Sequence, residues 1–364
     1  MTRRITALLF ACLVLAGLIA GCGGGSDSTS SSSSAETGSS ASSGKPEVTT
    51  KTIGVLDQAA ASSANQIMEQ VVNELADSLG WEVKSIDAQG SPEKITRGAT
   101  TLQNEGVDAL VAISIEPSLI RSSLEAFQGD DVPTCQIGGG QPASDLYTMQ
   151  FGEDEFKLGE ELGEYIAQVE PDAKVLALTN TSIYAGKERY AGFQKGLETA
   201  PGAEVVAESE INLEDPIGST TKATENGLAA HPEATAVYSI FDLFNPPATA
   251  AVKRIGSDAK VYGHFTSEVA TKELRDPSNP LAALGDSSLS KSSGLCMEQF
   301  LSQLIDEVPA NPDAIKTNPL TYEVIGKDDV DKFVEPGSYF AFPPEVASEE
   351  FLKQFESKYT LPTS

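Results

Sequence analysis

The stretch that decides the fold is residues 53–115, IGVLDQAAASSANQIMEQVVNELADSLGWEVKSIDAQGSPEKITRGATTLQNEGVDALVAISI. It begins with an apolar, β-branched run at 53–56, and similar runs return at 83–86 and 109–115. Short apolar runs of this kind predict strands that are buried on both faces of a sheet. The longer segments between them have helical periodicity, so the stretch predicts parallel strands joined by helices.

The ends of the two predicted helices are marked by particular residues. In the first helix apolar residues recur at a spacing of 3.6, and Gly80 follows as a C-terminal cap. The second helix opens at Ser91-Pro92-Glu93, which supplies a serine N-cap, a proline in the first turn and an acid at the positive end of the helix dipole. The predicted apolar faces are Ile67, Val71, Val72, Leu75 and Leu79 in the first helix and Ile95, Ala99 and Leu102 in the second.

The same alternation restarts after Gly152. A helix is predicted there from apolar residues at helical spacing, namely Leu158, Leu162, Ile166 and Val169. Further strands are predicted at 133–137, 175–179, 205–208, 237–241 and 261–265. Two successive runs of strands and helices predict the α/β class, with two doubly wound parallel-sheet lobes that are Rossmann-like.

The first 22 residues have the pattern of an export signal. Arg3-Arg4 precedes an uncharged apolar run at 5–19, which is too short to span a bilayer. The segment 18–22, LIAGC, resembles the lipobox of bacterial lipoproteins. This resemblance implies that residues 1–21 are a lipoprotein signal peptide and that Cys22 carries a lipid anchor. An ordinary secretory signal with a chance cysteine is the alternative.

Composition limits the class of protein further. Residues 22–47 are rich in Ser and Gly and cannot bury apolar surface, so we expect a disordered tether there. The remaining chain is long enough for two domains. A formal net charge of −28 without a basic stripe argues against nucleic acid as a partner. We therefore expect an extracytoplasmic protein that touches the cell membrane only through its lipid.

Several short motifs lie between residue 52 and about residue 335. They are LGW at 79–81, IDAQ at 86–89, GVDAL at 106–110, DVP at 131–133, ERYAGF at 188–193, HPEATAV at 231–237 and VYG at 261–263. In their order and spacing these motifs together resemble the ribose/galactose-type periplasmic binding proteins, which are the type I solute receptors of ABC importers.

The resemblance implies a type I periplasmic-binding-protein fold, in which a hinge of three chain crossings joins the two lobes. By position the crossings fall near Phe151, Ser288 and Thr317. The implied N-terminal lobe is 48–151 plus 289–317, the C-terminal lobe is 152–288 plus 318–335, and 336–364 is a C-terminal extension with a short helix. The ligand is expected in the cleft between the lobes, where the carboxyl ends of the strands meet.

The same topology implies that Cys135 and Cys296 are neighbours in the first lobe, despite 161 residues between them. They are the only cysteines that remain after the signal and the lipid anchor. Export leads to a compartment that permits a disulfide. Two buried free thiols are the alternative, since such thiols behave as small apolar residues.

The candidate ligand-binding residues lie in the loops that follow the predicted strands. Several positions that bind sugar hydroxyls in the family hold other residues here, notably Gly138-Gly139, Phe241 and Phe265. We therefore predict a ligand that is not a simple monosaccharide: a flatter and less polar compound, or a larger one that uses the space at 138–140. Lys187 is a candidate partner for a ligand carboxylate. The alternative for both phenylalanines is core packing at strand ends. The full candidate set is Gln58, Ser62, Ser63, Gly139, Tyr184, Lys187, Phe241, Asp242, Phe265 and Ser288.

These features predict a solute-binding lipoprotein that delivers a small molecule to an ABC permease and ATPase. A sensor that presents its ligand to a membrane receptor is the alternative function. An enzyme is not expected, because the chain has no Gly-x-Ser-x-Gly elbow, no metal-binding spacing of His and Cys, and only two histidines, His231 and His264. We expect a monomer without a metal or cofactor.

Overall fold

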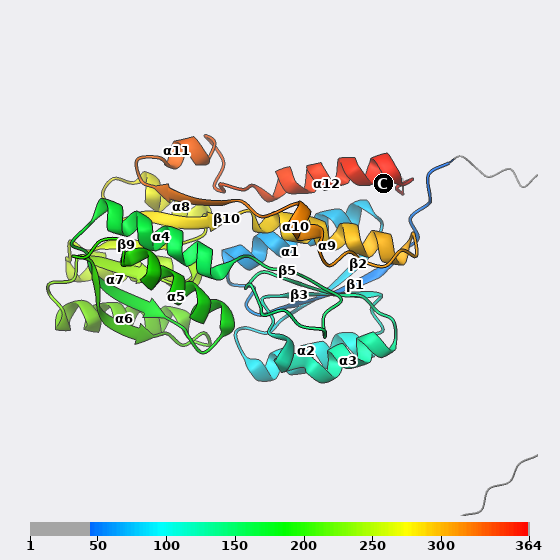
Figure 1. Cartoon of the computed structure of the whole chain (residues 1–364), viewed down its shortest axis with the longest axis horizontal. Helices are drawn as coiled ribbons and strands as arrows, with labels where there is room; N and C mark the ends of the chain where they lie inside the picture. Colours follow the sequence, from blue (N-terminus) through cyan, green and yellow to red (C-terminus); the bar gives the residue numbers. More distant parts are fainter. Residues whose placement is uncertain (1–43, 363–364) are drawn as a thin grey trace, which may run out of the picture. The chain divides into compact units, whose positions relative to one another are not determined.

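The computed structural model describes residues 44–362, in which two α/β lobes follow one another along the chain (Figure 1). The first lobe contains a five-stranded sheet with the order β2-β1-β3-β4-β5, and every pair of neighbours is parallel. Its strands are β1 (Thr52–Asp57), β2 (Glu82–Asp87), β3 (Ala109–Ile113), β4 (Thr134–Ile137) and β5 (Met149–Phe151).

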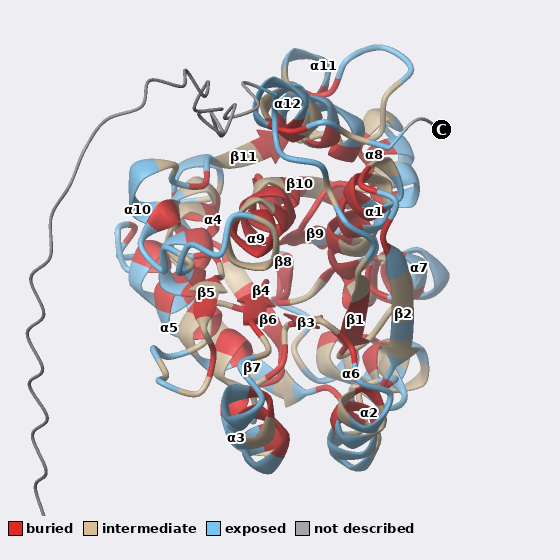
Figure 2. Ribbon diagram, turned by 90° about the vertical axis from the view of Figure 1, so that its right-hand side faces the viewer, coloured by how far each residue is buried: buried red, intermediate tan, exposed pale blue. Residues whose placement is uncertain are grey.

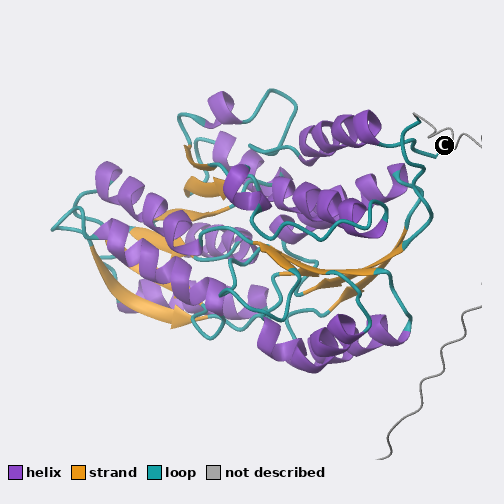
Figure 3. Cartoon of the chain, turned by 45° about the vertical axis from the view of Figure 1, so that its right-hand side comes forward, coloured by secondary structure: helices purple, strands orange, loops and turns teal. Residues whose placement is uncertain are grey.

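Helices cover both faces of the first sheet, which lies between them as the middle layer (Figure 3). One face packs against α1 (Ser63–Ser78), α9 (Leu289–Leu304) and α12 (Pro344–Lys358), with α10 (Ala314–Thr317) at its edge. The other face packs against α2 (Pro92–Asn104), η1 (Pro117–Ile120) and α3 (Arg121–Gly129).

The second lobe contains a six-stranded sheet with the order β11-β10-β9-β8-β6-β7. The other neighbouring strands are parallel, as predicted, whereas the edge strand β11 runs antiparallel to β10. The physical reason is the path of the chain, which returns to this lobe from the hinge end and therefore runs in the opposite direction. The strands are β6 (Lys174–Thr179), β7 (Glu204–Glu210), β8 (Ala236–Ser239), β9 (Lys260–His264), β10 (Leu281–Ser287) and β11 (Tyr322–Gly326).

A single apolar core fills the second lobe around this sheet, and buried residues concentrate on the strands and the inner helix faces (Figure 2). Its helices are α4 (Glu155–Val169), α5 (Tyr184–Leu197), α6 (Pro216–Ala230), η2 (Asp242–Phe244), α7 (Asn245–Ile255), α8 (Glu268–Arg275) and α11 (Val330–Phe333).

Glycines let α4 and α5 cross at very short range. A Cβ atom at Gly159 would collide with the carbonyl oxygen of Arg189, and one at Gly192 would collide with the carbonyl oxygen of Phe156. Only glycine permits such close backbone contact between packed helices. The crossing brings the first turn of α4 against the middle of α5, and this contact positions the charged groups described below.

The predicted strands are confirmed to within about two residues at their ends. Gly80 follows α1 with a φ of +67°, as the predicted cap requires, and Pro92 opens α2. Ser91 occupies the N-cap position of α2, but its side chain makes no capping hydrogen bond. Val169 was expected on an apolar face and is 45% exposed, because it is the last residue of α4. Strands β5 and β10 were not predicted from the sequence.

The C-terminal extension contains a fifteen-residue helix rather than a short one. Phe351, Phe355 and Tyr359 recur every four residues, and all three are buried in the core of the first lobe. Figure 1 shows α12 lying beside α1 and α9. Phe351 and Phe355 thus form an apolar stripe in the second half of α12, and Tyr359 continues it directly after the helix.

Residues 334–343, here called the C-terminal strap, make a fourth passage between the lobes. The chain also passes after β5, between β10 and α9, and between α10 and β11. Arg275 of α8 holds the strap to the second lobe by donating to the carbonyl oxygens of Val334 at 3.0 Å and Ser338 at 3.2 Å. The amide of Ala341 donates to Thr266 Oγ1 at 3.0 Å.

A disulfide joins Cys135 of β4 to Cys296 of α9, with the Cα atoms 6.1 Å apart. Both residues are fully buried in the first lobe. The bond therefore attaches the returning helix α9 to its sheet without crossing the cleft, and it joins the two cysteines that the resemblance places side by side. The signal peptide, Cys22 and most of the predicted tether lie outside the described residues. Within residues 44–362 no helix is long and apolar enough to cross a membrane.

Candidate ligand-binding cleft

A cavity of about 60 Å³, partly open to solvent, lies between the two lobes. Several of its walls come from loops that follow β1, β3, β4, β8 and β9, where ligands of open α/β sheets bind. The first lobe contributes Gln58, Ala59, Ser62, Ala64, Asn65, Met68, Ser114, Gly139 and Leu289. The remaining lining residues are Glu153, Glu155, Ile183, Ala185, Arg189, Leu213, Phe241, Asp242, Leu243 and Phe265.

The structure brings six of the ten candidate residues together on this cavity. They are Gln58, Ser62, Gly139, Phe241, Asp242 and Phe265. Ser63 lies next to them, and both its amide and its hydroxyl donate to Asp242.

Three further candidates, like Ser63, lie outside the cavity lining. Lys187 is exposed on α5 and does not line the cavity, so its role as a partner for a ligand carboxylate stays a prediction. Tyr184 is half-buried at the start of the same helix. Ser288 is buried at a crossing, where its hydroxyl accepts a hydrogen bond from the Thr321 amide at 2.9 Å.

The glycines at 138–140 do not leave room for a larger ligand, contrary to our expectation. A Cβ atom at Gly138 would lie 2.6 Å from Met68 Cε and 3.0 Å from Ser114 Oγ. The Met68 side chain therefore occupies the space next to Gly138. Both Gly138 and Gly139 have positive φ values, so the backbone turn itself favours glycine at these positions.

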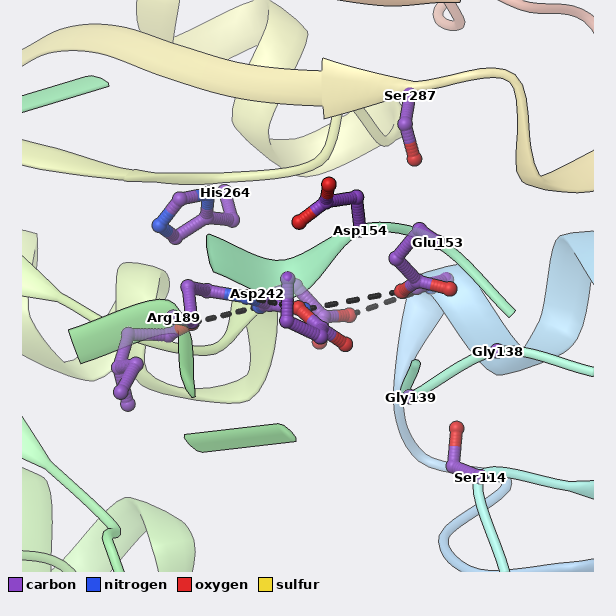
Figure 4. Close-up of polar contacts among 12 residues, drawn as sticks. Ser114, Gly138, Gly139, Glu153, Asp154, Arg189, Asp242, His264 and Ser287 are labelled. Atoms are coloured by element: carbon purple, nitrogen blue, oxygen red, sulfur yellow. Dashed lines mark hydrogen bonds and ion pairs between the residues drawn. The ribbon is translucent and has the colours of Figure 1, made fainter. Parts of the chain in front are cut away.

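Arg189 is the centre of a buried charged cluster that sequence analysis did not include in the site. Its side chain is 2% exposed, and its Nη2 lies 2.6 Å from Glu155 Oε2 and 3.8 Å from Glu153 Oε1. Its Nη1 donates to the Ile240 carbonyl oxygen at 2.8 Å. Figure 4 shows the ion pair between Arg189 and Glu153 at the cleft. The signal in the sequence was weak: two acids after β5, and an arginine in the ERYAGF motif.

Phe241 and Phe265 lie against the guanidinium group of Arg189. Its central carbon is 5.1 Å from the centroid of each ring, which is the range of a cation–π contact. Both rings therefore contact Arg189 and also line the cavity. This wall also carries the buried side chains of Arg189, Glu153 and Glu155, which were not predicted at the cleft from the sequence.

Burial shifts the proton affinities of groups around Arg189. Burial raises the pKa of Glu155 well above its usual range, although the attraction of Arg189 opposes this shift. Burial lowers the pKa of His264 well below its ordinary value, and the charge of Arg189 lowers it further. His264 is therefore neutral, and its Nε2 lies 3.2 Å from the Tyr238 hydroxyl. Among residues 44–362 no three His, Cys, Asp or Glu side chains cluster as a metal site would require.

Asp242 of the second lobe binds the N-terminus of α1 in the first lobe. Its carboxylate accepts from Ser62 Oγ at 3.0 Å, from Ser63 Oγ at 2.8 Å and from the Ser63 amide at 2.5 Å. A carboxylate at this end of a helix interacts favourably with the unpaired amides and with the helix dipole. Asp242 thus holds the lobes together across the cleft.

We expect Asp242→Ala to shift the protein toward a more open arrangement of the lobes. The substitution removes hydrogen bonds to a charged group, which contribute about 1.5–3 kcal/mol. Small-angle X-ray scattering should then give a larger radius of gyration than for the wild type. The matched control is Asp215→Ala, because Asp215 caps α6 within one lobe and accepts from the Gly218 amide at 3.1 Å. An unchanged radius for Asp242→Ala would contradict the prediction.

Asp57 gives the stability of the protein a pH dependence. Its Oδ1 accepts from Asn65 Nδ2 at 2.6 Å, whereas its buried Oδ2 has no partner among the described residues. Burial raises the pKa of Asp57 to about 7. The folded state therefore holds this proton more tightly than the unfolded state. The proton's contribution to the free energy of unfolding is fully present below about pH 4, and it is lost as the pH rises through about 7.

Asp57→Asn should remove part of this decline. The asparagine retains an acceptor for Asn65 but does not titrate. The free energy of unfolding of the variant should therefore fall less between pH 4 and pH 7 than that of the wild type. We expect a difference of about 1 kcal/mol or more, because one pKa unit corresponds to about 1.4 kcal/mol. Urea denaturation at the two pH values measures the difference. Equal declines in wild type and variant would show that Asp57 does not hold a proton in the folded state.

The chain has two α/β lobes, and a cavity lies where the carboxyl ends of their strands meet. Side chains from both lobes line this cavity. These features define a two-lobed ligand-binding protein. A model of the periplasmic binding protein domain matches residues 53–278. The chain therefore belongs to the periplasmic binding protein family, of type I, which confirms the resemblance drawn from the sequence motifs.

A curated relative is the ribose import binding protein of Bacillus subtilis, which is 28% identical over 199 residues. The match covers 54% of this chain and 64% of that protein. By its name this relative is a binding protein and not an enzyme, in agreement with the prediction.

Solved structures share the fold at low sequence identity. A Mycobacterium smegmatis protein in complex with β-D-fucofuranose has a TM-score of 0.68 at 16% identity, over 83% of this chain and 98% of that one. The 5-methylthioribose transporter solute-binding protein of Thermotoga lettingae has a TM-score of 0.69 at 15% identity, over 83% and 93%. The Caulobacter myo-inositol binding protein has a TM-score of 0.68 at 15% identity, over 79% and 97%.

Proposed function

We propose that this chain is an extracytoplasmic receptor that binds a small solute between its lobes and delivers it to an ABC importer. The observation that carries the proposal is the cavity between the lobes, which the Asp242 contact to α1 closes from the second lobe. A ligand that contacts both lobes would then stabilise the same closed arrangement of the lobes as the contact between Asp242 and α1 does. Membership of the periplasmic binding protein family supports the proposal.

We propose further that the receptor is attached to the cell membrane through Cys22. The support is the LIAGC segment and the Ser/Gly-rich stretch that follows it. Mass spectrometry of the membrane fraction should find the N-terminal peptide beginning at an acylated Cys22, and Cys22→Ser should release the chain from the membrane. A mature chain that begins elsewhere would contradict this part of the proposal.

The ligand that we propose is not a simple neutral monosaccharide. Arg189 is the only cationic side chain among the described residues that line the cavity, and Glu155 and the Ile240 carbonyl oxygen already accept its hydrogen bonds. Sugar hydroxyls need paired donors and acceptors when they are desolvated. Lys187, which matches a sugar-binding arginine of the family, is exposed and outside the cavity lining.

The test of the receptor function is native mass spectrometry of the protein purified under mild conditions, followed by thermal scans with the compound found. At a hundred times its dissociation constant a ligand should stabilise the protein by about 2.7 kcal/mol. That corresponds to a shift of roughly 5 °C or more for a chain of this size. Cells that lack the chain should lose uptake of the compound. Retained uptake with a lost transcriptional or motile response would instead favour the sensor function.

A further inference from the structure

The buried wall of the cavity carries one more negative group than positive groups. Glu153 and Glu155 have side chains that are 2% and 1% exposed, and both line the cavity. Arg189 lies between them and supplies a single positive charge. Asp242 does not enter this balance, because the N-terminus of α1 already binds its carboxylate.

Two oxygen atoms of this cluster have no hydrogen-bond partner among the described residues. They are Glu153 Oε2 and Glu155 Oε1, and both are buried. A buried acceptor without a partner costs about 1–3 kcal/mol, and more when it is charged. Figure 4 shows the carboxylate of Glu153 directed into the space between the lobes. Both oxygen atoms are closed to solvent within the cavity wall, where the carboxyl groups of Glu153 and Glu155 lie beside each other.

Without another cation the cluster keeps a proton. Burial raises the pKa of Glu155, and the neighbouring carboxylate of Glu153 raises it further, against the opposing effect of Arg189. The titratable and charged groups that interact with Glu155 are Arg189, Glu153, Tyr184, Tyr238 and Tyr322. All three tyrosines have a raised pKa and are neutral at pH 7, so none of them balances the charge.

We propose that the ligand supplies the missing positive charge: it is a small organic cation whose ammonium group donates hydrogen bonds to Glu153 and Glu155. This inference rests on the proposed receptor function and specifies its ligand class. An ammonium group carries several donors on one charged atom and satisfies both free oxygens. A bare metal ion fits less well, since no third acid or histidine joins the pair among residues 44–362.

Binding then releases a proton. The ammonium ion enters with its charge, the proton leaves the carboxyl group of Glu155 to the buffer, and the cluster of Arg189, Glu153, Glu155 and ligand is neutral. A neutral polyol causes no such release, because the protonated Glu155 can remain as a donor to a hydroxyl. Proton release therefore distinguishes the two ligand classes.

The experiment is isothermal titration calorimetry of the full chain in two buffers that differ in ionisation enthalpy. The probes are matched pairs: 2-aminoethanol and ethylene glycol, 1,4-diaminobutane and 1,4-butanediol, glucosamine and glucose. We expect at least one amine to bind 100-fold or more tightly than its neutral partner, with release of a proton. Glu155→Gln keeps an acceptor and loses the charge, so it should weaken binding of that amine about 10-fold or more.

Matched variants make the result specific. Glu164→Gln removes an exposed carboxylate from the same helix α4 and should leave the affinity unchanged. Glu153→Gln serves if Glu155→Gln fails to fold, and it should also lower the affinity for the amine. The inference is overturned if no amine binds, or if a neutral probe binds wild type and Glu155→Gln equally. In the second case the receptor function stands and only the cationic ligand class is lost.

Discussion

Replacing Arg189 by methionine is expected to lower the free energy of unfolding by about 3–5 kcal/mol, the range for a buried ion pair that loses one partner. The substitution removes the cation between Glu153 and Glu155, which lie in a wall that is almost closed to water. It also removes the donor to the Ile240 carbonyl oxygen and the contacts to Phe241 and Phe265. Urea unfolding at pH 7, followed by circular dichroism, measures the loss.

The control for this prediction is Arg254→Met. Arg254 belongs to the same lobe, but its side chain is 56% exposed and its ion pair with Glu225 lies at the surface. Exposed pairs contribute about 0–1 kcal/mol, so this variant should stay close to the wild type. Adding Glu155→Gln to Arg189→Met should recover part of the lost stability, because it removes the uncompensated charge. If both arginine variants were equally stable, Arg189 would not neutralise the buried acids.

Loss of the Cys135–Cys296 disulfide is expected to have an effect of similar size. The bond closes a loop of 161 residues, for which the chain-entropy model gives about 5 kcal/mol as an upper value. In the double variant Cys135→Ala/Cys296→Ala, the midpoint of guanidinium unfolding should fall strongly. Because both residues lie within the first lobe, ligand binding by the folded variant should be retained.

Reduction of the wild type provides an independent check of the disulfide. The reduced protein should unfold at nearly the same guanidinium concentration as the double alanine variant, since both lack the covalent link. Labelling of two thiols in the denatured, unreduced protein would contradict the bond. So would an unfolding midpoint that does not respond to reductant.

The alternation of strands and helices could be predicted from local sequence. Apolar runs such as 53–56 and 109–115 identify buried strands, and Gly80 and Pro92 mark helix ends without any knowledge of the tertiary fold. Strand β5 is only three residues long, which leaves too little periodicity to recognise. The antiparallel edge strand β11 depends on the path of the chain through the other lobe, and no local pattern encodes that path.

The candidate site could be predicted only where residues directly follow a strand. Gln58, Gly139 and Phe241 were found in this way, and all three line the cavity. The pair of Arg189 and Glu155 was not found, because 34 residues separate its members. Their contact depends on the close crossing of α4 and α5, and the sequence does not show which turn of one helix meets the other. Burial then changes the chemistry of the pair, which composition cannot indicate.

The C-terminal strap has a mechanical consequence. Its beginning is held by Arg275 in the second lobe, and α12 at its end is packed against α1 and α9 in the first. The ten residues from 334 to 343 can span at most about 36 Å when fully extended. Rotation of the lobes away from each other must therefore stop when this segment is taut. The strap is thus one of four connections that limit how far the two lobes can separate.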